Sequence, residues 1–370
     1  LLGAVFPQVS RSGETVAFSY QGAIWKMPRK GDVMTQLTAA AGFDVRPTWS
    51  PDNKCIAFIR GHNSLVGPVH MVHADDGKDI KLPKEVVAKD KLFFDREGKR
   101  ILSIFRREGG RYSLCWLEVL TGNLGSEVYS DAWGLRFALS QDGNSIALVT
   151  TQDIREQQGG NNGPACDLWI VPVGGGDLTK VVHFPGRVYD ISWTADDQAL
   201  YLVTNVGGVH NDLWKVPLKD ALRGMRKLTF GQADEDSPSV SRSDPRLWYT
   251  DNRHGPTALV VRDPRTKQDS VVTVLKKVYH NVPGTLSIEV SDSDTSGPTT
   301  ARVSVRQLHG KFYAPPSSLY RMLKGEVHFY CQGATEFSVP AGEYLVKVAR
   351  GPEYVVAHKE VEVPAGKTVS

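Results

Sequence analysis

The sequence predicts an all-β protein: a six-bladed β-propeller over residues 1–280, followed by a small β-sandwich over residues 284–370. Three observations predict this fold. A hairpin motif occurs six times, a third strand follows it at near-constant spacing, and this period stops near residue 284. Gly and Pro, at 35 and 21 of 370 residues, favour many turns and short elements over long helices.

The repeated motif is a β-hairpin, and its best copy runs from Trp49 to Phe58. It reads as an apolar strand, a tight turn rich in Asp and Gly, and a second strand of alternating apolar residues. The other copies begin at Val9, Leu139, Asp95, Thr194 and Ser241, the last three being weaker. Each second strand carries an apolar residue six positions after the first polar residue of its copy: Val16, Ile56, Ile101, Ile146, Leu200 and Leu247.

A third strand follows each hairpin and fixes the number of blades. It is clearest in Asp167–Pro172 and Asp212–Pro217, which both read Asp-Leu-Trp-x-Val-Pro. The position of its Trp recurs at Trp25, His70, Cys115, Trp169, Trp214 and Leu259. The successive spacings are 45, 45, 54, 45 and 45 residues, which predicts six units of three or four strands, the long one with a polar insert near 157–162. The only helix expected lies near Leu218–Met225.

These motifs resemble the TolB family of β-propellers over roughly residues 1–278. The resemblance rests on the Ser-Pro-Asp-Gly-type hairpin, the Leu-Trp-x-Val-Pro strand, and the Leu-Thr pairs at Leu37-Thr38 and Leu228-Thr229. Three prolines stand three residues before a hairpin Ser and fit the same pattern: Pro7, Pro47 and Pro238. Blade three departs from it, because Asp95–Gly98 replaces the usual turn. The family motif is structural, so the resemblance implies no catalytic residue.

The second region consists of short alternating runs separated by turns. In the run from 344 to 350, Tyr344, Val346 and Val348 share one face of a strand. Pro340–Gly342 supplies one of the turns between such runs. A series of short strands of this kind predicts a small β-sandwich.

The stretch Val339–Tyr344 makes this sandwich similar to the prealbumin-like and carboxypeptidase-regulatory-like sandwiches. More narrowly, residues 284–370 resemble the sandwich that precedes a PHP-type metallohydrolase domain in the CehA/McbA group, on the motifs at 312–316, 326–330 and 351–354. That resemblance implies a TolB-like propeller first and a metal-dependent catalytic domain last, either linked to this chain or associated with it. The sequence ends before any such domain.

Composition and charge restrict the partners. Lys and Arg number 44 against 41 Asp and Glu, so a net charge of +3 gives no strong field for nucleic acid or an anionic membrane. No run approaches the ~18 apolar residues of a transmembrane helix, so membrane insertion is not expected. Four cysteines without a Cys-x-x-Cys pair predict buried thiols, with one disulfide left open. No signal peptide precedes the first strand, so the chain is either processed or a fragment, and we expect a periplasmic or extracellular protein.

The sequence contains no recognisable catalytic or metal-binding motif. There is no His-x-His pair, no His-Glu-x-x-His and no Gly-x-Ser-x-Gly elbow. Asp292–Gly297 resembles the first half of an EF-hand loop, but Val303 stands where a bidentate Glu is required, which favours a polar turn. We therefore predict no catalytic residue, no metal and no cofactor. Because loops from distant blades converge in a propeller, His62 and His254 are the pair through which a funnel metal could bind.

Candidate binding residues follow from the topology of a propeller. Blade-to-blade loops and the loops between second and third strands open on one face, here called the loop face, and the repeated hairpin turns open on the other, the turn face. The loop face collects charged and aromatic residues around a central funnel, which could bind a peptide, a glycan or an anionic small molecule. The predicted binding residues are Asp44, Arg46, Trp133, Arg136, Arg187, Tyr189, Asp236, His62 and His254. A solvated set of loop residues is the alternative interpretation.

Three functions remain open. We favour a noncatalytic binding or scaffold module that recognises a protein, peptide or glycan at the funnel. The first alternative is the N-terminal accessory region of a larger secreted metal-dependent hydrolase, which a coding sequence continuing into His-x-His motifs would support. The second is a propeller enzyme with a metal at the funnel, which metal analysis of the purified chain would test.

Overall fold

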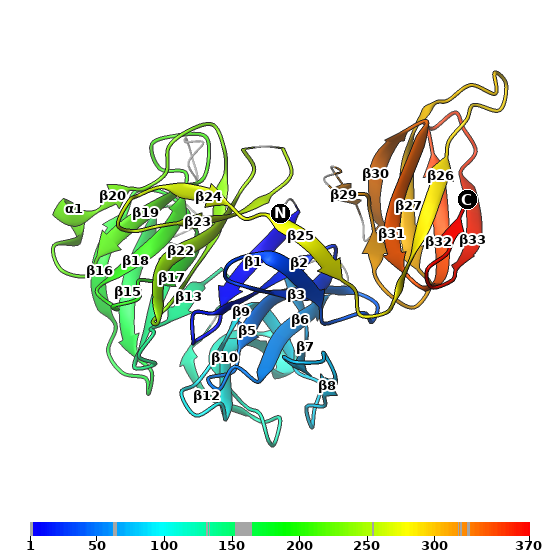
Figure 1. Cartoon of the computed structure of the whole chain (residues 1–370). Coiled ribbons are helices and arrows are strands. Elements are labelled where there is room, and N and C mark those ends of the chain that lie inside the picture. Colours follow the sequence, from blue (N-terminus) through cyan, green and yellow to red (C-terminus); the bar gives the residue numbers. More distant parts are fainter. Residues whose placement is uncertain are drawn as a thin grey trace.

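The computed structural model describes residues 3–61, 65–130, 132, 134–151, 165–253, 255–316, 318, 320–323 and 326–370. Strands dominate these ranges and form a propeller followed by a smaller two-sheet domain (Figure 1), which confirms the predicted fold class. The helices described are one 3-10 turn, Glu108–Gly110, and α1, Ala221–Gly224. Helix α1 is shorter than the expected Leu218–Met225, and its Leu222 is 75% exposed.

The first three blades are antiparallel sheets of consecutive strands. Blade one contains β1 (Ala4–Val9), β2 (Thr15–Tyr20), β3 (Ala23–Pro28) and β4 (Asp32–Gln36). Blade two contains β5 (Phe43–Trp49), β6 (Cys55–Gly61), β7 (Val66–His73) and β8 (Asp79–Ile80). Blade three contains β9 (Val87–Phe94), β10 (Arg100–Arg106), β11 (Tyr112–Glu118) and β12 (Leu124–Tyr129). Strand β7 also pairs with β9, which joins blades two and three.

Blades four to six repeat this arrangement. Blade four contains β13 (Arg136–Leu139), β14 (Ser145–Thr151), β15 (Cys166–Pro172) and β16 (Thr179–Phe184). Blade five contains β17 (Val188–Trp193), β18 (Ala199–Thr204), β19 (Asp212–Pro217) and β20 (Arg226–Lys227). Blade six contains β21 (Glu235–Ser241), β22 (Asp244–Asp251), β23 (Ala258–Arg262) and β24 (Asp269–Val271).

The hairpin motif recurs because its polar residues hydrogen-bond within their own turn. In blade two the Ser50 hydroxyl donates to Asp52 Oδ1 (2.6 Å), and its oxygen accepts from the Cys55 amide (2.9 Å). In blade three Asp95 takes the place of the Ser, since its Oδ1 accepts from the Arg100 amide at 3.2 Å. The weaker copy therefore closes its turn with the same kind of bond, which is why it still forms a blade.

The ring is closed by blade six meeting blade one. The inner strand β1 contacts β21. Strand β25 (Val274–Val278) then crosses to the outer edge of blade one and pairs parallel to β4. Its Lys277 ammonium donates to the Tyr20 hydroxyl (2.7 Å) and lies over that ring. The chain thus fastens the ring from outside, while the four strands of each blade remain consecutive.

The second domain consists of two facing sheets. One contains β31 (Ala334–Pro340), β26 (Pro283–Glu289) and β34 (Thr368–Val369) in that order. The other contains β29 (Tyr320–Leu323), β30 (Glu326–Gln332), β27 (Thr300–Gln307), β32 (Gly342–Ala349) and β33 (Ala357–Val363), with β28 (Phe312–Tyr313) beside β27. The core between the sheets includes Leu286, Val303, Phe329 and Tyr344. Tyr344 and Val346 lie on the buried face, as the alternation predicts.

Aromatic side chains join this domain to blades one and two. The Phe312 ring, on β28, lies 5.5 Å from Phe43 at the start of β5. Tyr279, in the connection between the domains, has edge contacts with Trp25 of blade one (5.5 Å) and Tyr313 of the sandwich (6.4 Å). These contacts place the sandwich on the side of the first two blades, as Figure 1 shows.

Candidate functional site

The structure sorts the nine predicted binding residues into three groups. Trp133, His62 and His254 lie outside the described residues. Asp44 lies at the contact with the sandwich. The other five lie on or next to inner strands of the propeller: Arg46, Arg136, Arg187, Tyr189 and Asp236.

Asp44 does not line a funnel. Its side chain is fully buried, and it accepts two hydrogen bonds from Arg60, at 2.6 and 3.0 Å. The Lys311 ammonium of the sandwich lies 2.8 Å from the same carboxylate and donates to the Gly42 carbonyl (2.7 Å). The expectation for Asp44 is therefore corrected: its charge binds the sandwich to blade two and is closed to a ligand.

A layer of ion pairs joins the inner strands of blades two to five around the central channel. Its centre is Arg46 on β5, which is 9% exposed. One guanidinium nitrogen lies 3.0 Å from Asp190, and another lies 3.1 Å from Asp90. The Phe6 ring lies 4.2 Å from the guanidinium carbon. Burial opposes the charged form of Arg46, but the two carboxylates outweigh it and raise its pKa, so the arginine stays charged.

Two further cations complete this charged layer. Lys91 forms an ion pair with Asp190 and also donates to the Ile191 carbonyl (2.6 Å). Burial disfavours the ionised carboxyl of Asp190, but Lys91 and Arg46 overcome this and lower its pKa. Arg136 lies 3.8 Å from Asp90 and donates to the carbonyl of Tyr189 (2.8 Å). Each of these three cations therefore has an acidic partner inside the protein.

Asp236 is the half-buried member on the loop side of this layer. Its Oδ1 accepts from the Ser237 amide (2.6 Å). Burial and the neighbouring charge of Asp190 raise the pKa of Asp236, although Arg46 opposes the shift. Next to it, the Arg187 guanidinium lies 5.1 Å over the Tyr189 ring. On the loop-face side of the layer lie the carboxylate of Asp236 and the guanidinium of Arg187, which stacks on Tyr189.

Strand irregularities aim these side chains at the axis. The inner strands of blades one, two, three, five and six all contain a register shift at the layer. Phe6, Arg46, Asp90 and Ser237 have positive φ there, between 54° and 70°. A bulge of this kind turns a side chain out of the strand alternation and is frequent next to functional sites.

Sequence reasoning missed Asp90, Lys91 and Asp190. A signal for two of them is present in the repeat. Lys91 and Asp190 stand four residues before the first polar residue of their hairpin, the position of Arg46 and Arg136. Aligning the six copies at this one position would have identified the layer.

On the turn-face side of the layer the channel opens into a cavity. All six blades line it. Trp49 and Trp193 form part of its wall, each held by an indole hydrogen bond of 2.9 Å to a backbone carbonyl. Lys91 of the layer is among its lining residues, and Arg11 and Arg242 lie beside the hairpin turns at its rim. This cavity lies on the face opposite to the one that the sequence analysis favoured.

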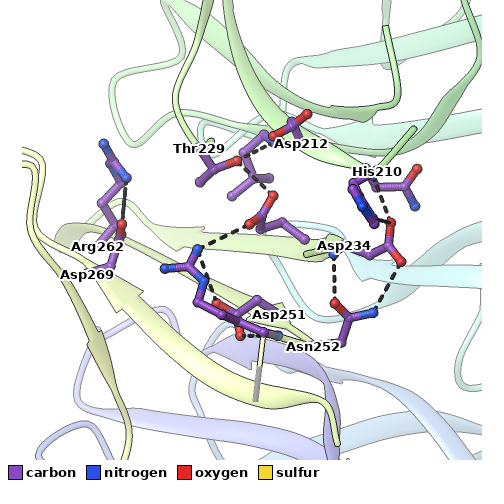
Figure 2. Close-up of polar contacts among 12 residues, drawn as sticks. His210, Asp212, Thr229, Asp234, Asp251, Asn252, Arg262 and Asp269 are labelled. Carbon is purple, nitrogen blue, oxygen red and sulfur yellow. Dashed lines mark hydrogen bonds and ion pairs between the residues drawn. The ribbon is translucent and has the colours of Figure 1, made fainter. Parts of the chain in front are cut away.

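A second polar group lies between blades five and six (Figure 2). Glu235, at the start of β21, is 1% exposed, and its Oε2 accepts from the Thr229 hydroxyl (2.9 Å). Its other oxygen lies 3.5 Å from Arg253, which also lies 3.7 Å from Asp251. Burial raises the pKa of Glu235 to about 7, and the nearby charge of Asp212 contributes to the rise. The hydrogen bond from Thr229 opposes this shift.

Neither a metal centre nor a membrane span is found in the described ranges. The His, Cys, Asp and Glu residues placed there do not form a group of three or more that could hold a metal ion. The helices described are too short to cross a membrane. His62 and His254 are outside these ranges, so the proposed funnel metal is not addressed by this geometry.

Solved TolB structures have the same fold as the propeller. The putative TolB of Agrobacterium tumefaciens matches 67% of this chain and 89% of its own length, with a TM-score of 0.53 and 13% identity. TolB of Acinetobacter baumannii matches 70% of this chain and 63% of its own length, with a TM-score of 0.55 and 13% identity. The propeller is TolB-like.

The tricorn protease matches 99% of this chain and 36% of its own length, with a TM-score of 0.56 and 14% identity. This chain therefore spans about a third of that protein. The sequence matches no protein-family model and no curated protein. The structural matches establish the TolB-like fold. At identities this low they show no activity, which has to be argued from the site.

Proposed function

We propose that this chain is a noncatalytic binding module whose ligand enters the central channel of the TolB-like propeller from the turn face. The observation that carries the proposal is the lining of the cavity, to which all six blades contribute. A concave site to which every repeat contributes combines apolar walls with a few convergent polar groups, which is typical of ligand sites.

The lining favours a peptide that carries an acidic side chain or a free carboxylate. Trp49, Trp193 and Phe93 supply aromatic wall for an extended chain. Arg11 and Arg242 at the rim have no ion pair within the part of the chain that the structure describes. Charged arginines at the mouth of an aromatic cavity attract and orient a carboxylate. A glycan is the second ligand class, and the experiment separates the two.

The experiment compares the two faces. Peptides selected from a random heptapeptide phage library, and a panel of neutral and acidic oligosaccharides, are titrated against three proteins by fluorescence anisotropy. These are the wild type, a turn-face variant with Arg11→Ala and Arg242→Ala, and a loop-face variant with Arg106→Ala and Arg187→Ala. The two variants lose the same charge, so each is the control for the other.

Selected peptides are expected to be acidic and to bind the turn-face variant at least ~10-fold more weakly, the size of one or two lost charged hydrogen bonds. Unchanged binding to the loop-face variant assigns the ligand to the turn face. Loss in the loop-face variant alone would move the site to Arg187, Tyr189 and Asp236. If oligosaccharides bind and no peptide does, the ligand is a glycan and not a peptide. If neither class binds, the proposal of a binding module is refuted.

The first alternative function rests on the resemblance of residues 284–370 to the sandwich that precedes PHP-type metallohydrolase domains. A coding sequence that continues past Ser370 into His-x-His motifs would decide for it. A propeller enzyme with a funnel metal held by His62 and His254 is the second alternative, and stoichiometric metal in the purified chain would support it. Under each of these functions we propose a periplasmic or extracellular location.

A further inference from the structure

A pocket separate from the channel lies between blades five and six, on the turn-face side. Tyr201 and Leu247, both buried, are among its apolar lining. Basic side chains from three elements surround it: Lys215 of β19, Arg226 and Lys227 of β20, and Arg262 and Lys267 of the β23–β24 hairpin. Its volume is about 350 Å³, and the described residues that line it include no acid.

Only part of this positive charge is neutralised by the protein. Arg262 pairs with Asp269 at 2.8 Å (Figure 2), and Lys227 pairs with Asp212 at 2.7 Å. For Lys215, Arg226 and Lys267 no ion pair is present in the ranges that the structure describes. Asp196 attracts Lys215 over a longer distance, but its carboxylate already accepts from Thr194 at 2.6 Å. The pocket therefore has a net positive charge.

The equivalent cleft between blades one and two is closed by the protein itself. Lys26 occupies the place of Lys215, since Lys26 pairs with Ala17 as Lys215 pairs with Tyr201 in the second strand of the blade. The Lys26 ammonium donates to the Ala74 carbonyl of the next blade at 2.5 Å. Lys215 makes no such bond in the described structure, so the same position faces an open cleft.

An aromatic ring stands at the rim of the pocket. Phe230 is 68% exposed, and the Lys227 ammonium lies 5.3 Å from its centre. Phe230 lines the same pocket as Lys215, Arg226 and Lys267, so it provides a stacking surface beside an anion site. A ligand that has both a flat ring and several negative charges would use both features.

We propose that this pocket between blades five and six binds a small phosphate ester of a ring compound, with at least two negative charges. The phosphate oxygens would accept from Lys215, Arg226 and Lys267, and the ring would lie against Phe230. Arg262 remains paired with Asp269 and would add a positive field from the wall. The site shares no lining residue with the channel cavity, so it is independent of the binding function proposed above.

The experiment titrates ADP, tripolyphosphate and adenosine by isothermal calorimetry at low ionic strength. The test variant is Arg226→Ala with Lys267→Ala, and the matched control is Lys81→Ala with Arg111→Ala, which removes the same charge from exposed positions of blades two and three. We expect ADP to bind the control with the same affinity as the wild type, and we expect the same for tripolyphosphate. Binding to the test variant should be at least ~10-fold weaker, and adenosine should not bind.

A Phe230→Ala variant tests the ring contact separately. It should weaken the binding of ADP several-fold and leave the affinity for tripolyphosphate unchanged, because only ADP carries a ring. Equal ADP affinity in the wild type and the Arg226→Ala, Lys267→Ala variant would overturn the proposal, as would absence of ADP and tripolyphosphate binding to the wild type. Loss of tripolyphosphate affinity in Phe230→Ala would overturn the role of the ring. The channel experiment is unaffected by either result.

Discussion

The junction between blades one and two and the junction between blades five and six are built on the same plan. In both, a Thr hydroxyl after the outer strand accepts from the amide of the third strand at 2.9 Å, Thr38 in one and Thr229 in the other. Six residues later a buried acid begins the next inner strand, Asp44 or Glu235. The repeat thus creates a buried carboxylate at both places.

What meets the carboxylate differs. Asp44 is held by two cations, one of which, Lys311, comes from the sandwich. Glu235 lies opposite another acid, Asp251, in the strand register, and its only cation within the described chain, Arg253, is 3.5 Å away and 45% exposed. Burial therefore raises the pKa of Glu235 to about 7.

The comparison shows how one repeated position serves two purposes. At the first junction the carboxylate attaches a second domain, and Lys26 closes the cleft on the turn-face side. At the other junction neither contact is present in the described part of the chain, so Glu235 has no second cation and the cleft lined by Lys215 stays open. Equivalent repeat positions therefore make structural contacts at the junction of blades one and two and lack them, within the described chain, at the junction of blades five and six.

Replacing Asp44 by Ala should produce the largest effect, because it breaks the closed junction. Lys311 is fully buried and would keep only the Gly42 carbonyl as its partner. Leaving a buried charge unpaired costs about 3–5 kcal/mol. We expect the free energy of unfolding, measured with urea, to fall by that amount.

The double variant Asp44→Ala with Lys311→Met is the control for this loss. It removes the orphaned charge as well, so it should be clearly more stable than Asp44→Ala alone. If Asp44→Ala costs less than about 1 kcal/mol, the ion pair does not hold the junction, and the aromatic contacts of Phe312 and Tyr279 carry it.

Replacing Glu235 by Gln sharpens the comparison through pH. The folded pKa of about 7 lies above the ordinary 4.5, so the folded protein holds this proton more tightly than the unfolded chain. The contribution of the protonated Glu235 to the free energy of unfolding is fully present below pH ~4.5 and is lost as the pH rises through ~7. Gln stays neutral, so the unfolding free energy of Glu235→Gln should rise relative to that of the wild type by about 2–3 kcal/mol between pH 5 and pH 8.

Urea titrations of both proteins at pH 5 and pH 8 measure this difference. The equivalent variant at the closed junction, Asp44→Asn, removes a buried carboxylate that two cations hold, so it is the matched control for the general effect of neutralising a buried acid. A constant difference between Glu235→Gln and wild type would mean that Arg253 keeps the carboxylate ionised throughout this range.

The blades could be predicted because their signal is local. The Ser50 hydroxyl, Asp52 and the Cys55 amide bond within six residues, so each turn leaves the same pattern in the sequence. The alternation that places Tyr344 in the sandwich core is local as well. Short-range bonds of this kind do not depend on how the blades are arranged.

The channel layer could be predicted only in part because its partners are far apart in the chain. Arg46 and Asp190 are 144 residues apart, and their contact depends on the rotation between blades. Asp44 was expected at the funnel, but its carboxylate lies in an ion pair with Lys311 of the other domain, which no repeat predicts. The pairing of charges across domains needs the assembled structure.

Replacing Lys26 by Ala should produce a smaller effect and test the difference on the turn-face side. The Lys26 ammonium donates to the carbonyls of Ala74 (2.5 Å) and Asp75 (3.3 Å) after the third strand of the neighbouring blade, so its loss removes two hydrogen bonds between blades, together worth about 1–2 kcal/mol. The matched variant Lys215→Ala removes the equivalent residue where no such bridge is present in the described chain, and its stability should stay within about 0.5 kcal/mol of wild type. Urea unfolding measures both. The effects on ADP binding should be the reverse, since Lys215→Ala alone removes a cation of the open pocket. Equal losses of stability in the two variants would show that both clefts are closed, which would end the distinction between the two sides of the propeller.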